Sequence, residues 1–121
     1  MSGPSALRGF PLREFIATHL RAAGVDVQAR PKDVGSISQR LARMADNGPQ
    51  PDLLGHDMAG FYVHVRSDAR DYWARALDQV EAVADPADLP ILIEPKKYAP
   101  GDAWVLMSLP TFGRLLTERR S

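Results

Sequence analysis

The run Leu89-Pro-Ile-Leu-Ile93 constrains the fold more than any other stretch of the chain. It carries no charge and is too short for a buried helix, so it is typical of a strand that other elements cover on both faces. Such a strand belongs in a sheet with helices packed against it, which is the α/β class. The chain has 121 residues, enough for one core, and we expect a single domain over residues 1–121.

Helical and strand patterns alternate along the rest of the chain. Apolar residues at helical spacing predict helices over residues 11–23, 36–47, 69–83 and 109–116. Alternating or continuous apolar runs predict strands over residues 25–29, 52–55, 61–66, 89–93 and 103–107. The order is helix, strand, short helix, two strands, helix, two strands, helix, which describes a mixed central sheet of about five strands flanked by helices. We expect residues 1–9 to be a flexible N-terminal arm.

Two helix starts carry capping residues. Ser36 and Gln39 have the spacing of a capping box, in which each side chain bonds to the backbone of the other residue. Asp68 precedes the third helix and is suited to cap it. Both features predict where a helix begins.

Charge and cysteine content exclude several classes of function. The 15 basic and 15 acidic residues balance, which argues against a protein that coats nucleic acid by charge alone but leaves a local basic groove open. The absence of Cys excludes disulfide scaffolds, Cys-based zinc sites and thiol catalysis. The first ten residues lack the apolar part of a signal peptide, and no apolar run approaches the length of a membrane span. We expect a soluble, cytoplasmic protein with no membrane partner.

The predicted strand over residues 61–66 places a polar pair on one of its faces. Side chains alternate along a strand, so the apolar residues at odd-numbered positions share one face, whereas His64 and Arg66 share the other. This pair can belong to an active site, to the remnant of one, or to the solvated side of a sheet. The residues alone leave these three interpretations open.

The order and spacing of several segments resemble a known family. These segments are Asp52-Leu-Leu-Gly55, Gly60-Phe-Tyr-Val-His-Val-Arg66, Trp73, Leu89-Pro-Ile-Leu-Ile93, Ala103-Trp-Val-Leu-Met107 and Phe112. Together they resemble the small Holliday-junction resolvase-like nucleases of phages, which belong to the restriction-endonuclease-like PD-(D/E)xK superfamily. The resemblance extends from the first helix to the last. It implies a restriction-endonuclease-like fold and a phage-infected or prophage-bearing bacterial host.

The resemblance also implies a metal site, and this chain departs from it. In the family, an Asp and a Glu on neighbouring strands hold Mg²⁺ or Mn²⁺, and a Lys two residues after the Glu helps to place the attacking water. The matching positions here are Asp52, His64 and Arg66. Imidazole removes a negative charge from a site for hard cations, and Arg keeps its proton at ordinary pH. The resemblance therefore implies a degenerate catalytic site without a cofactor, with Mg²⁺ or Mn²⁺ bound only if the site is active.

A rearranged metal site is an alternative. Glu94 and Lys96 repeat the E-x-K spacing on the next predicted strand, so Asp52 and Glu94 could serve as metal ligands with Lys96 as a substitute for the lost Lys. Pro95 argues against this, because proline lacks the N–H that a strand ladder needs. We therefore expect Glu94 and Lys96 to begin a loop that continues through Pro100.

Three functions remain open. The favoured one is a nuclease-like protein that binds DNA, branched or duplex, or a host protein, without cleaving it. The residues expected to contact phosphate or carboxylate groups are Arg13, Arg66, Lys96 and Lys97. The alternatives are an active metal-dependent DNA endonuclease with a rearranged site and a small phage protein-interaction domain with no nucleic-acid role. The resemblance also implies a homodimer, since resolvase-like folds that act on four-way junctions are generally dimers. A basic stripe over these four residues would favour nucleic acid, and an exposed apolar patch would favour a protein partner.

Overall fold

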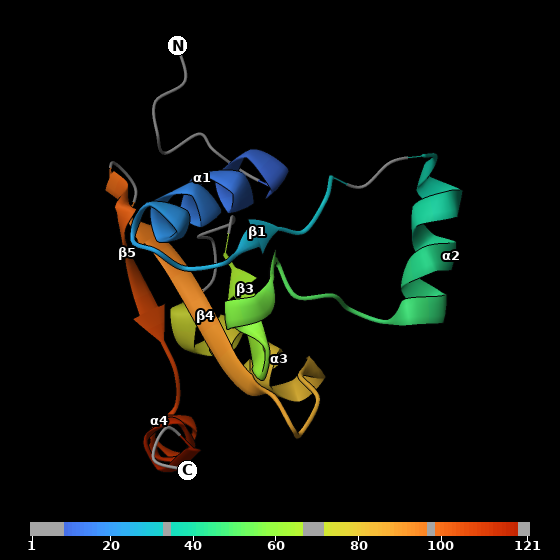
Figure 1. The fold of residues 1–121 in the computed structure, drawn as a ribbon. Coiled ribbons are helices and arrows are strands. Elements are labelled where there is room, and N and C mark those ends of the chain that lie inside the picture. Colours follow the sequence, from blue (N-terminus) through green and yellow to red (C-terminus); the bar gives the residue numbers. More distant parts are fainter. Residues whose placement is uncertain (1–8, 33–34, 67–71, 97–98, 119–121) are drawn as a thin grey trace.

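The computed structural model describes residues 9–32, 35–66, 72–96 and 99–118 (Figure 1). The helices are α1 (Gly9–Ala22), α2 (Ile37–Asn47), α3 (Trp73–Val83) and α4 (Leu109–Glu118). The strands are β1 (Gln28–Ala29), β2 (Leu53–Leu54), β3 (Phe61–Val65), β4 (Leu89–Lys96) and β5 (Ala99–Leu106), and a 3-10 helix, η2 (His56–Met58), lies between β2 and β3. The predicted order of helices and strands is confirmed, with η2 as an addition.

The strands form two sheets instead of the predicted single sheet of about five strands. In the larger sheet β4 lies between β3, which is parallel to it, and β5, which is antiparallel. β1 and β2 form a separate antiparallel pair. The N–H of Asp52 donates to the carbonyl of Val63 at 2.8 Å and links this pair to β3. β1 and β2 have only two residues each. The hydrogen-bonded ladder of this pair therefore does not continue into the larger sheet.

Gly55 explains why β2 stops where it does. Its φ is 133°, a conformation that side-chain-bearing residues rarely adopt. A Cβ atom at this position would lie 2.6 Å from the carbonyl oxygen of Asp26. Glycine therefore lets the chain turn out of β2 while it stays close to the segment that leads into β1.

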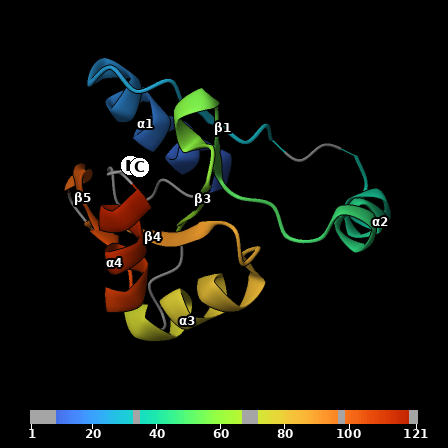
Figure 2. The same ribbon diagram turned by 60° about the horizontal axis from the view of Figure 1, so that its bottom comes forward.

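Helices α1 and α3 lie on opposite sides of the larger sheet (Figure 2), and an apolar cluster lies on each side. Val63 and Val65 of β3 pack with α1, β1 and β2 on one side. Tyr62 of β3 and Leu92 of β4 pack with α3 on the other side. The predicted alternation along β3 is confirmed, and β4 is covered on both faces as its apolar run predicted.

The end of β4 corrects a prediction. Glu94 and Lys96 were expected in a loop, but both belong to β4, with Glu94 opposite Trp104 and Lys96 opposite Ala99 of β5. The pairing register shifts between Glu94 and Lys96. Between these two pairs β4 has the single residue Pro95, whereas β5 has residues 100–103. The extra residues therefore belong to β5, and Pro95, which lacks an N–H, lies where the regular ladder is interrupted.

Two predictions concern the starts of helices α1 and α3. Residues 1–8 of the expected arm and the predicted cap Asp68 lie outside the described residues. The ninth residue of that arm, Gly9, begins α1. α3 begins at Trp73, and the side chain of Tyr72 at its N-cap makes no capping hydrogen bond.

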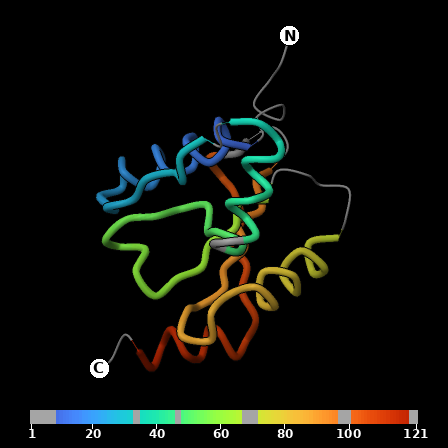
Figure 3. Tube along the Cα trace, turned by 90° about the vertical axis from the view of Figure 1, so that its right-hand side faces the viewer, coloured from blue at the N-terminus to red at the C-terminus, as the bar shows by residue number. Residues whose placement is uncertain are grey.

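Helix α2 stands apart from the sheets and lies in front of them when the molecule is seen from that side (Figure 3). The predicted capping box is confirmed, since Ser36 and Gln39 exchange both bonds. Three large apolar side chains of α2 are mostly exposed: Ile37 (67%), Leu41 (59%) and Met44 (60%). We call these three residues the α2 stripe. None of the helices in the described part of the chain has the length and apolar character needed to cross a bilayer.

A matched pair of Leu→Ala variants compares how much a buried core residue and an exposed residue of α2 contribute to the free energy of unfolding. Leu92 is fully buried and Leu41 is 59% exposed. Leu92→Ala is expected to lower the free energy of unfolding by about 2–5 kcal/mol because it leaves a cavity. Leu41→Ala is expected to change it by less than about 0.5 kcal/mol. Urea denaturation checks both values, and a large loss for Leu41→Ala would show that α2 packs against the body.

Candidate functional site

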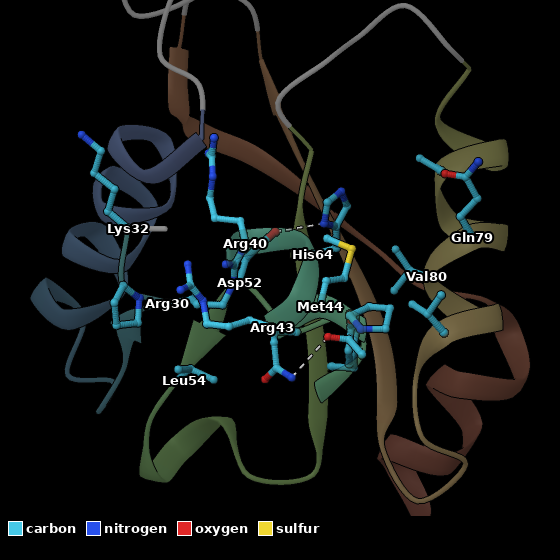
Figure 4. A pocket seen from close by; sticks show the side chains of 17 residues that line it. Arg30, Lys32, Arg40, Arg43, Met44, Asp52, Leu54, His64, Gln79 and Val80 are labelled. Atoms are coloured by element: carbon cyan, nitrogen blue, oxygen red, sulfur yellow. Dashed lines mark hydrogen bonds and ion pairs between the residues drawn. The ribbon is translucent and has the colours of Figure 1, made fainter. Parts of the chain in front are cut away.

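A groove of about 640 Å³ lies between α2, α3 and the neighbouring strands (Figure 4). Among the described residues that line it, five are basic: Arg30, Lys32, Arg40, Arg43 and His64. Asp52 is the acidic residue among them, and the apolar members include Met44, Leu54, Val80 and Val83. We call this site the basic groove.

Asp52 lies at the base of the groove and holds three parts of the chain together. It is 5% exposed. Its Oδ2 accepts a hydrogen bond from the N–H of Val65 at 2.7 Å and lies 2.9 Å from Nδ1 of His64. Its Oδ1 accepts from Nη2 of Arg30 at 3.1 Å. The carboxylate thus joins β3 to the residue that follows β1.

The surroundings of Asp52 keep its carboxylate ionised. Burial raises the pKa of Asp52, but hydrogen bonds from His64, the Val65 N–H and Arg30, together with the charge of His64, lower it more. The net pKa lies below the ordinary value of 3.8. Three donors therefore occupy an ionised carboxylate, and a metal ion at Asp52 would have to compete with them.

Arg66 and Glu94 form a second pair. The Arg66 side chain is 6% exposed, and its Nε lies 3.3 Å from Oε2 of Glu94. Burial raises the pKa of Glu94, and Arg66 opposes this without cancelling it. Because Arg66 follows β3 and Glu94 lies in β4, the two strands place these side chains together. The structure thus pairs Asp52 with His64, and Glu94 with Arg66.

The other predicted contact residues do not share a surface with these pairs. Arg13 is 7% exposed, and its Nη2 donates to the carbonyls of Arg30 at 3.0 Å and Pro31 at 3.3 Å. Lys96 is exposed, with its Nζ 5.2 Å from the ring centroid of Trp104. Lys97 lies outside the described residues. The basic stripe that would have favoured nucleic acid is therefore not formed by those of its members that the structure describes, because Arg13 and Arg66 are buried.

The Arg and Lys residues of the basic groove were not among the predicted contact residues. Arg40 and Arg43 are three residues apart on α2, a spacing that puts them on neighbouring positions of one helix surface. That signal was present in the sequence. That they line the same groove as Arg30 was not, because it depends on where the fold places α2 relative to the strands. No three His, Cys, Asp or Glu side chains within the described ranges lie close enough together to hold a metal ion.

Comparison with known proteins identifies no relative. No model of a protein family matches the chain. No curated protein and no solved structure matches it either. Function is therefore inferred from the geometry of the basic groove and from the resemblance described above.

The pKa of Asp52 leads to a test of its structural role. Because folding lowers this pKa, the ionised carboxylate stabilises the fold above pH 3.8, and this contribution disappears as the pH falls through the lowered pKa. Asp52→Asn is expected to lower the free energy of unfolding by about 1–3 kcal/mol at neutral pH. As the pH falls through the lowered pKa of Asp52, the difference from the unmodified protein should shrink.

Urea denaturation at several pH values measures this dependence. Asp78→Asn is the matched control, since Asp78 is exposed on α3, and it should change stability by less than about 0.5 kcal/mol. A loss for Asp52→Asn that is the same at pH 7 and at acid pH would contradict a role for the carboxylate charge.

Proposed function

We propose that the protein binds nucleic acid through the basic groove and does not cleave it in a metal-dependent reaction. The observation that carries this proposal is the convergence of Arg30, Lys32, Arg40 and Arg43 on one groove. Guanidinium and ammonium groups bind phosphate oxygens by charge-assisted hydrogen bonds. Arg side chains dominate the set, and their planar fork suits two-point contacts with phosphate.

The charge distribution supports this proposal despite the neutral total. Basic and acidic residues number 15 each, so a basic groove requires acidic residues to lie elsewhere. Glu81, Asp85 and Asp88 line a separate hollow between the end of α3 and α4. A local positive region with a neutral total favours binding at one site over coating of the whole polymer.

The partners of the carboxylates support binding without cleavage. Metal-dependent nucleases use carboxylate oxygens as ligands for hard cations. Here Asp52 is engaged by Arg30, His64 and the Val65 N–H, and Glu94 by Arg66. A resolvase-like, restriction-endonuclease-like ancestry with a degenerate site agrees with this arrangement. Within that resemblance the ligand is DNA, and the setting is the cytoplasm of a phage-infected or prophage-bearing bacterium.

The salt dependence of binding tests the groove. Arg40→Ala is expected to weaken DNA binding and to reduce the slope of log affinity against log salt by about 1, since one phosphate contact is lost. Arg114→Ala is the matched control, because Arg114 lines the hollow beside α4 and not the groove. Fluorescence anisotropy over a salt series gives both affinity and slope. Equal effects of the two substitutions would contradict binding in the groove.

A cleavage assay tests the second half of the proposal. A labelled four-way junction and a matched duplex are expected to remain intact with the protein in the presence of Mg²⁺ or Mn²⁺, because donors from the protein occupy Asp52. Asp52→Ala is run beside the unmodified protein. Cleavage that is lost in Asp52→Ala would mean that the site is an active, rearranged nuclease centre, with Glu94 and Lys96 as the next residues to change.

The α2 stripe favours a second candidate function, association with another protein. Ile37, Leu41 and Met44 are all more than half exposed, and an apolar helix surface in contact with water is a common docking site for a partner. A host protein or a second copy of this chain could supply the covering surface. Failure of every DNA probe to bind at low salt would favour this function over nucleic-acid binding.

A further inference from the structure

We propose that the basic groove takes unpaired nucleotides, with phosphates on its cationic side and bases on the wall made by α3. This proposal rests on the proposed function and names the form of nucleic acid that fits the groove. It follows from the way in which charged and uncharged side chains are divided between the walls.

The two sides of the groove differ in chemistry (Figure 4). Arg30 and Lys32, which follow β1, line one side. The residues of α3 that line the opposite side carry no charge: Ala76, Gln79, Val80 and Val83. The two sides are thus suited to different parts of a ligand.

Helix α2 contributes both kinds of side chain. Arg40 and Arg43 add cations, and Met44 adds an apolar group. Met44 is 60% exposed and Val83 is 47% exposed. Covering such surface with an apolar ligand face is favourable because it removes the surface from water.

A duplex does not match this division. Its bases are stacked and paired inside, so an uncharged wall would meet sugar and phosphate and gain little. An unpaired nucleotide presents a flat base on one side and a phosphate on the other. The apolar side chains of α3 and Met44 can pack against that base while the cations bind the phosphate. The amide of Gln79, on the same wall, can donate to and accept from a base edge.

The size of the groove agrees with a short unpaired segment. Its volume of about 640 Å³ lies in the range of sites that enclose one small organic molecule, about 300–1,000 Å³. That space suits one base or a few, with the rest of the strand outside. The proposed ligand is therefore a single strand, or an unpaired stretch within a longer nucleic acid.

Direct comparison of probes tests the proposal. A labelled 12-nucleotide single strand, the duplex of the same sequence and a single strand of abasic sugar-phosphate units are measured by anisotropy in EDTA at one low salt concentration. The single strand is expected to bind about tenfold more tightly than the other two, because only it offers unpaired bases to the α3 wall.

A pair of double variants links this preference to the groove. Met44→Ser with Val83→Ser is expected to lower single-strand binding toward the level of the abasic strand and to leave duplex binding unchanged. Val105→Ser with Leu109→Ser is the matched control, since both residues are exposed (60% and 80%) and lie outside the groove. The control should bind every probe as the unmodified protein does, and thermal unfolding checks that both variants fold.

The outcomes separate this proposal from the one on which it rests. Equal affinity for single strand and duplex, with no effect of the Met44 and Val83 changes, would overturn the preference for unpaired nucleotides and leave nucleic-acid binding in place. No binding of any probe would overturn both. Displacement of the single strand by an equal concentration of thymidine monophosphate would also overturn the strand proposal, because the groove would then be a site for a free nucleotide.

Discussion

The buried carboxylate of Asp52 is the interaction on which the site depends. Its backbone N–H binds β3 through Val63, and its side chain accepts hydrogen bonds from Val65, His64 and Arg30. One ionised group thus joins two sheets that share no continuous ladder. A charge held away from water must be compensated by donors of this kind.

This constraint also shapes the basic groove. Arg30 is held by Asp52 through its side chain, and its carbonyl accepts from Arg13. Arg13 is thereby withdrawn from the surface, while Lys32, two residues after Arg30, is left exposed. Helix α2 completes the groove from the far side without packing into either apolar cluster. The groove therefore has two sides that belong to the body, one at Arg30 and Lys32 and the other at α3, and a third side, α2, that projects from the body.

Features that depend on neighbouring residues were predicted correctly from the sequence, whereas features that depend on distant segments were not. The capping box at Ser36, the alternation along β3 and the buried run of β4 were all predicted, because each depends on neighbouring residues. The continuation of β4 past Pro95 was missed, since a proline in isolation predicts the end of a strand and only the pairing with β5 shows that the strand continues. The single sheet was also wrong, because nothing local shows how short β1 and β2 are.

The candidate site divides in the same way. The sequence by itself determined that His64 lies on the polar side of β3 and that Arg40 and Arg43 share a helix surface, since helical and strand periodicity place side chains within a few residues. Only the tertiary structure decided that Asp52 is bonded to His64, that Arg66 is paired with Glu94, and that Arg13 is buried. A charged side chain takes its partner from whatever the fold brings within about 3–4 Å. These partners come from segments that are far apart in the sequence, so no periodic pattern along the chain predicts them.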